Sequence, residues 1–248
     1  MKARNFVLAA ALTLIICISS QRVVKAGGLS SVTTSAGAAV IKGVVKFAGV
    51  APAPQPIRMS ADPSCARQHS RPVLRREVVV DSQGGLQYAI VFIANGLGDR
   101  TFDPPAQPAV ISQKGCLYEP HLLAVRENQP FEVVNDDPTS HNIHPTPANN
   151  REWNKAEPPG ARVEEVFPRE EIAIPVKCNI HPWMRGYIAV LKNPYFAVTK
   201  QDGSFDLPNL PPGTYTIKAW HEKLGTATQT VTIAANQKKE ISFVFKSM

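Results

Sequence analysis

The chain has 248 residues, of which 44% are apolar and 19% are charged, and this balance excludes wholesale disorder. Its length allows one large or two small domains, and we expect two. The formal net charge of +7 comes without a Lys/Arg cluster or an aromatic ladder, so the composition gives no case for a nucleic-acid partner.

The N-terminus has the three-part layout of a secretory signal peptide. Lys2 and Arg4 precede an uncharged, mostly apolar run at 6–18, and 24–26 supplies small residues for cleavage. The run is shorter than the ~20 residues that a membrane-spanning helix needs. We therefore predict that 1–26 is removed, that no stable membrane insertion follows cleavage, and that the mature protein is periplasmic or secreted.

Cleavage would also change the charge. It removes four basic residues and no acidic ones, so the net charge falls from +7 to +3. A modest positive balance suits a mildly acidic protein partner.

Residues 27–39 are rich in small side chains, and we interpret them as a flexible leader. Beyond them, helical periodicity is nearly absent, and short alternating or β-branched runs recur between turn residues. This pattern is typical of an all-β fold built from β-sandwiches. We expect an N-terminal β segment at 40–107, and strands at 40–47, 77–80, 86–93, 131–135 and 186–191.

The most informative motif lies at 177–184. Cys178, His181 and Met184 place a thiolate, an imidazole and a thioether on one short loop. These soft ligands favour copper, and a plane of two His and one Cys with a weak axial Met is the blue-copper arrangement. The segment 140–144, Ser-His-Asn-Ile-His, supplies a second histidine. Zinc is the competing metal, but zinc sites rarely use Met.

The sequence Cys-Asn-Ile-His-Pro-Trp-Met-Arg-Gly, with His-Asn-Ile-His upstream, resembles the ligand loops of amicyanin-type small blue copper proteins, which are cupredoxins. The segment 118–131 resembles that family's early strands. The resemblance covers 108–192 and implies a Greek-key cupredoxin β-sandwich. It also implies one type 1 copper, held by His141, Cys178, His181 and Met184.

The same resemblance gives roles to neighbouring residues. Asn142 occupies the position whose backbone helps to tie the two ligand loops together. His141 is preferred to His144 on motif alignment alone, and His144 remains the alternative ligand. Trp183 and Pro145 are expected to form an apolar skirt around an exposed edge of His181, which would be the electron port. The alternative is that Trp183 packs in the core.

Two turn motifs follow Tyr195, namely Asp-Gly-Ser-Phe at 202–205 and Leu-Pro-Pro-Gly-Thr-Tyr at 210–215. They resemble the carboxypeptidase regulatory-like (transthyretin-like) β-sandwich, so we assign 193–248 to such a segment. The match is short for that domain, and its missing first strands are sought at 40–47 and 88–93. On that interpretation, 40–107 and 193–248 form one discontinuous domain around the copper domain. Further strands are expected at 214–220, 228–233 and 240–245.

Export would leave three cysteines, Cys65, Cys116 and Cys178. A copper thiolate must stay unoxidised, so parity assigns Cys65 and Cys116 to a disulfide. The alternative is a second metal site in which His69 and His121 join these two cysteines.

The leading functional hypothesis is a non-enzymatic carrier of single electrons whose partner is a redox protein such as a cytochrome c or a dehydrogenase. The alternative is a copper storage or delivery protein. Copper nitrite reductases and multicopper oxidases need further histidine clusters, and six histidines cannot build a trinuclear centre. An adhesion or sugar-binding module is suggested only by the C-terminal sandwich, and a fold does not establish a function.

Overall fold

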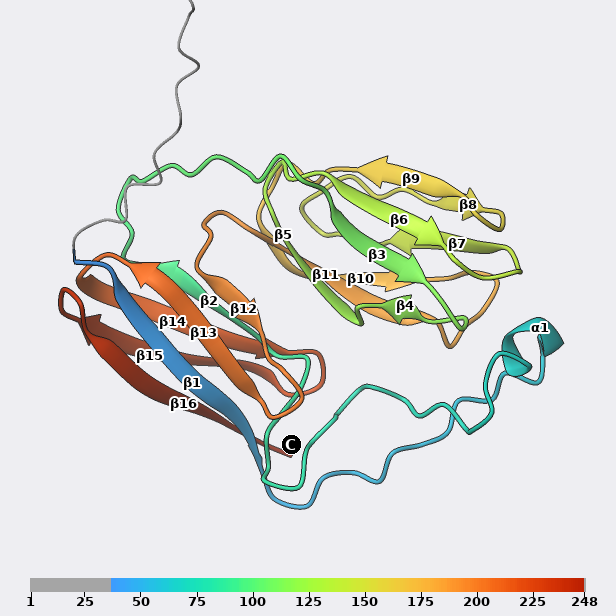
Figure 1. Cartoon of the computed structure of the whole chain (residues 1–248), viewed down its shortest axis with the longest axis horizontal. Helices are drawn as coiled ribbons and strands as arrows, with labels where there is room; N and C mark the ends of the chain where they lie inside the picture. Colours follow the sequence, from blue (N-terminus) through green and yellow to red (C-terminus); the bar gives the residue numbers. More distant parts are fainter. Residues whose placement is uncertain (1–36, 248) are drawn as a thin grey trace, which may run out of the picture. The chain divides into compact units, whose positions relative to one another are not determined.

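The computed structural model describes residues 37–247, which form two β-sandwiches and a long connecting segment (Figure 1). The predicted signal peptide at 1–26 and most of the predicted leader at 27–39 lie outside the described residues. Within 37–247, no helix has the length and apolar character that crossing a bilayer requires. The one α-helix in this part of the chain is α1 (Pro63–Ala66), a single turn.

The first sandwich is formed by 109–191, within the segment whose sequence resembles cupredoxins, and we call it the cupredoxin sandwich. Its sheets have the strand orders β5-β11-β10-β7-β8 and β4-β3-β6-β9, so neighbouring strands are mostly distant in sequence. The strands are β3 (Ala109–Gln113), β4 (Tyr118–Glu119), β5 (Leu122–Arg126), β6 (Phe131–Asn135), β7 (His141–Pro145), β8 (Lys155–Glu157), β9 (Arg162–Glu165), β10 (Glu171–Lys177) and β11 (Arg185–Leu191).

The core of this sandwich comes from side chains that alternate along its strands. Phe131 and Val133 of β6 and Ile188 and Val190 of β11 are fully buried in one apolar cluster. Residues two apart lie on the same face of a strand, and this places each pair in the space between the sheets. The predicted strands 131–135 and 186–191 are therefore confirmed as β6 and β11.

The second sandwich combines strands from both ends of the described chain. Its sheets have the orders β13-β1-β16 and β12-β2-β14-β15. In this sandwich β1 pairs antiparallel with β13 and parallel with β16, while β2 pairs antiparallel with β12 and β14. The strands are β1 (Ala39–Ala48), β2 (Ile90–Asn95), β12 (Phe196–Val198), β13 (Ser204–Leu210), β14 (Gly213–His221), β15 (Gly225–Ile233) and β16 (Lys238–Lys246).

Strand segments from 40–47 and 88–93 thus share a sandwich with the C-terminal segment, and the predicted domain boundaries themselves stay predictions. The Asp-Gly turn has a clear physical cause. Gly203 has φ +74, and a Cβ at this position would lie 2.3 Å from the carbonyl oxygen of Val45. Only glycine fits where β1 passes so close to the turn before β13.

Two predicted strands differ from the structure. The segment 77–80 forms only an isolated bridge between Val80 and Leu86, and β2 begins at Ile90 rather than at 86. Tyr88 has φ +61, which is left-handed backbone that cannot continue a strand.

Residues 50–80, which we call the arm, connect β1 to β2 and contain no named strand. The arm folds back on itself, since the Ile57 N–H donates to the carbonyl oxygen of Val73 over 2.7 Å. Asp62 caps α1 by accepting the Ser64 N–H over 2.8 Å.

A disulfide between Cys65 and Cys116 fixes the arm to the cupredoxin sandwich, with the two Cα atoms 5.5 Å apart. The predicted disulfide is confirmed. The alternative second metal site is wrong, because both sulfurs are already bonded to each other. His69 instead lies 2.8 Å from the carbonyl oxygen of Gly115, and His121 pairs with Glu222.

Candidate metal centre

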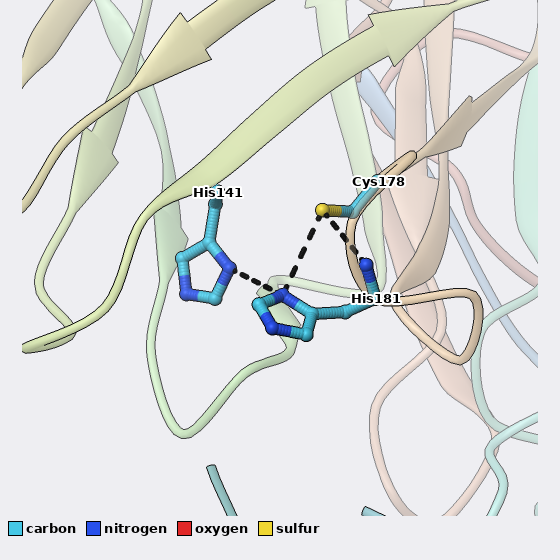
Figure 2. A group of neighbouring side chains, drawn as sticks. All are labelled: His141, Cys178 and His181. Carbon is cyan, nitrogen blue, oxygen red and sulfur yellow. Dashed lines mark hydrogen bonds between the residues drawn. The ribbon is translucent and has the colours of Figure 1, made fainter. Parts of the chain in front are cut away.

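Three of the four predicted ligands come together inside the cupredoxin sandwich. His141 begins β7, while Cys178 and His181 belong to the loop between β10 and β11, as Figure 2 shows. The Nδ1 atoms of the two histidines are 2.9 Å apart, and Cys178 Sγ lies 3.8 Å from His181 Nδ1. One ligand atom from each residue lies within 4.8 Å of the other two. All three side chains are buried.

Backbone hydrogen bonds shape the loop that carries Cys178, His181 and Met184. The Cys178 N–H donates to the Met184 carbonyl oxygen over 3.1 Å, and the Met184 N–H donates to the His181 carbonyl oxygen over 2.9 Å. The His181 N–H also points at Cys178 Sγ, over 3.4 Å. Met184 is fully buried in the same apolar cluster as Cys178. The loop is a compact turn whose ends are held by the β10–β11 ladder.

His141 and His144 have different surroundings although both lie on β7. They are three residues apart, and an odd spacing puts side chains on opposite faces of a strand. The ring nitrogens of His144 lie 3.2 Å from Asn179 Oδ1 and 2.7 Å from Glu152 Oε1, outside the cluster of Cys178 and His181. The choice of His141 as the ligand stays a prediction, and this arrangement supports it.

Two carboxylates that the sequence analysis missed orient the histidine rings. Asp137 Oδ2 lies 2.8 Å from His141 Nε2, and Asp62 Oδ2 lies 2.9 Å from His181 Nε2. Because each carboxylate contacts the Nε2 atom of its histidine, the Nδ1 atoms of both rings face the interior of the cluster. Metal-ligating histidines commonly hydrogen-bond a carboxylate through their second ring nitrogen in this way. Asp137 was within reach of sequence reasoning, since it precedes His141 by four residues in a short turn. Asp62 was not, because it comes from the arm.

The electrostatics of the site favour a thiolate beside a charged imidazole. Burial opposes protonation of His141, but Asp137 and the Cys178 sulfur outweigh it and raise the His141 pKa to about 9. Burial likewise disfavours the thiolate, yet His141 and the backbone N–H groups of Asn142 and of the loop lower the pKa of Cys178. A thiolate is the form of cysteine that binds metals.

Asn142 ties the two ligand segments together through its side chain. Its Oδ1 accepts the Asn179 N–H over 2.7 Å and lies 3.4 Å from Cys178 Sγ. Its carbonyl oxygen accepts the buried Tyr118 hydroxyl over 2.6 Å. The prediction gave this role to the backbone of Asn142; its backbone N–H is among the groups that lower the pKa of Cys178, and its side chain adds the contact to the Asn179 N–H.

The predicted exposed edge of His181 is wrong. The His181 residue is only 2% exposed, because the arm covers the outer side of its ring. Asp62 accepts from its Nε2, and Cys65 Sγ lies 3.7 Å from the same atom. Trp183 flanks the ring with centroids 5.1 Å apart, and its indole N–H donates to the Cys116 carbonyl oxygen over 3.2 Å.

The donor set fits a soft transition metal. Two imidazole nitrogens and a thiolate-forming cysteine converge at a buried site, and the Met184 thioether is buried in the same apolar cluster as the cysteine. The two nearby carboxylates are engaged with the outer ring nitrogens and leave the inner nitrogens available. A buried histidine outside this site, His221, ends β14 in the second sandwich, and burial lowers its pKa to about 4.

Comparison with known proteins gives partial matches. Residues 188–246 match the model of the carboxypeptidase regulatory-like domain, a match that begins within β11. No curated protein matches the sequence.

Solved copper proteins are similar to part of the chain. A copper-containing nitrite reductase from Thermus scotoductus SA-01 is similar over 39% of this chain at 20% identity and a TM-score of 0.33, and the match spans 25% of that chain. A purple cupredoxin from Nitrosopumilus maritimus is similar over 34% of this chain and 99% of its own, at 26% identity and a TM-score of 0.30. A mutant of amicyanin in its Cu(I) form is similar over 42% of this chain and 99% of its own, at 17% identity and a TM-score of 0.32.

Proposed function

We propose that the protein binds one type 1 copper ion through His141, Cys178, His181 and Met184 and carries single electrons between exported redox partners. The observation that carries the proposal is the convergence of three of these donors, His141, Cys178 and His181, within 4.8 Å in a buried site. The mature protein is proposed to work in the periplasm or outside the cell, with a cytochrome c or a dehydrogenase as its partner.

Copper bound at this site would supply a one-electron couple. The chain's own residues prepare the site for it. Asp137 and Asp62 fix the orientation of the two rings, and the lowered pKa of Cys178 makes the thiolate available. The ligand segments are anchored in β7, β10 and β11, so a change of oxidation state requires little movement of the chain.

The alternative of copper storage or delivery is less well supported. Delivery requires a site from which metal exchanges with a partner, whereas Cys178 is 3% exposed and His181 is 2% exposed. An enclosed site favours retention of the metal. No enzymatic activity is proposed.

The test is the visible and EPR spectrum of the mature protein loaded with one equivalent of Cu(II). We expect one bound copper, an intense thiolate-to-copper absorption, and reversible one-electron reduction in voltammetry. Cys178→Ser should lose the absorption, whereas Asn179→Ala, one residue along the same loop, should keep it. A protein that binds no copper, or a Cys178→Ser variant that stays intensely coloured, would refute the proposal.

A further inference from the structure

The arm closes the outer side of His181, so a redox partner cannot approach that ring directly. Asp62 and Cys65 occupy the position in front of its Nε2 atom. The nearest aromatic neighbour on the same loop is Trp183, whose ring centroid is 5.1 Å from that of His181. Trp183 is half-buried, and it lines a cavity of about 750 Å³. Trp183 therefore connects the His181 ring with this cavity.

The cavity has an excess of positive charge. Its lining contains five cationic side chains but only two carboxylates, those of Glu77 and Glu222. The cationic side chains are those of Arg58, Arg75, Arg76, Arg185 and Lys223.

The carboxylates near the cavity do not neutralise this charge. Arg76 pairs with Glu119, which does not line the cavity, and Glu77 is shared between Arg75 and Lys223. Arg58 and Arg185 form no ion pair with any residue of 37–247. Counting Glu119 with the lining carboxylates still leaves an excess of two positive charges.

The rest of the described chain is close to neutral. Residues 37–247 contain 23 Lys and Arg against 20 Asp and Glu, an excess of three. The cavity lining alone accounts for an excess of that size. A positive field confined to one concave surface steers an oppositely charged partner toward it and sets its orientation.

We propose that this cavity docks a carboxylate-rich surface segment of an acidic redox protein, so that Trp183 lies between His181 and the docked partner. The inference rests on the proposed function, because it names the partner class and the contact surface of the same metal centre. Arg58 and Arg185, which both line the cavity, would pair with the partner's carboxylates. Pro182 and Trp183 would supply the apolar part of the contact.

The test uses the full mature chain without metal, so it does not depend on copper binding. Two probes are titrated into ¹⁵N-labelled protein, namely an octaglutamate peptide and hexacyanochromate(III), an inert paramagnetic trianion. We expect the peptide to shift the indole N–H signal of Trp183 and the trianion to broaden it, both effects weakening as salt is added.

Charge reversal locates the binding site. Arg58→Glu changes an exposed residue with no hydrogen bond or ion pair in the described chain, and it should weaken peptide binding on the order of tenfold. The matched control is Lys46→Glu, an exposed lysine of β1 in the second sandwich, which should change binding by less than about twofold.

Three outcomes would overturn the inference. They are an undisturbed Trp183 signal, equal weakening by both charge reversals, and binding of hexacyanochromate without binding of the peptide, since the last indicates a site for small anions only. A protein that gives the copper spectrum but fails these titrations would overturn this inference alone. A protein that binds the peptide but no copper would overturn the proposed function instead.

Discussion

Replacing Cys65 and Cys116 together by Ser removes the covalent link between the arm and the cupredoxin sandwich. The two cysteines are 51 residues apart in sequence, and the bond therefore closes a long loop in the unfolded chain. The chain-entropy model gives a loss of about 14 cal/mol/K for a loop of this length, which is about 4 kcal/mol at 25 °C. We expect the double variant to lose stability on that order.

The loss should appear first as detachment of the arm. Outside the disulfide, the arm contacts the cupredoxin sandwich through Asp62 and His181, through His69 and the Gly115 carbonyl oxygen, and through Met59, which is buried in the apolar cluster of that sandwich. A single hydrogen bond contributes only about 1 kcal/mol net to stability. Detachment uncovers His181, which is 2% exposed when the arm is in place.

Two measurements on the metal-free mature protein check this reasoning. Urea denaturation followed by tryptophan fluorescence gives the free energy of unfolding, and diethyl pyrocarbonate labelling with peptide mass mapping gives the accessibility of His181. Cys178→Ser, which keeps the disulfide, is the control and should leave His181 protected. If the double variant loses less than about 1 kcal/mol and His181 stays unlabelled, the arm is held by its non-covalent contacts and the reasoning is wrong.

Three further predictions concern single residues. His141→Ala should abolish the thiolate-to-copper absorption while His144→Ala keeps it, and the reverse result in visible spectra would move the ligand to His144. Met184→Leu should still bind copper but with a higher reduction potential, because the thioether no longer donates to Cu(II), and an unchanged voltammogram would argue against an axial role. Burial lowers the pKa of His221 from 6.5 to about 4, so the folded state binds fewer protons than the unfolded state between these values. The free energy of unfolding should therefore fall by up to about 3 kcal/mol as the pH drops from 6.5 to 4. His221→Leu should flatten this pH dependence in urea denaturation, and an equally steep dependence in the variant would contradict the prediction.

Local sequence patterns predicted much of the fold. Alternating apolar residues located β6 and β11, and the Asp-Gly turn marked the start of β13 because Gly203 passes close to the backbone of Val45. Errors arose where backbone conformation overrode the apolar pattern. Tyr88 has left-handed φ and delays the start of β2, which no alternation of side chains reveals.

In the candidate site, too, local features could be predicted from the sequence and contacts between distant segments could not. The spacing of Cys178, His181 and Met184 reflects a single turn, whose geometry is encoded within a few residues. Asp62 approaches His181 from a segment more than one hundred residues earlier, and its contact depends on how the arm is tethered. The burial of His181 depends on this tertiary contact with the arm. No residue near His181 in the sequence indicates it, and the prediction of an exposed electron port was therefore wrong.

The pairing of β1 with β16 constrains the order in which the chain can assemble. Val40 lies beside Lys238 in a parallel ladder, so β1 lacks one of its two neighbours until residues 238–246 have been made. All nine strands of the cupredoxin sandwich lie between β2 and β12, and every partner they need is available earlier in synthesis. Pairings between segments distant in sequence are slow to form, so the edge of β1 that pairs with β16 stays unpaired in the meantime. The cupredoxin sandwich is therefore expected to fold first, and the sandwich that pairs β1 with β16 is expected to close afterwards.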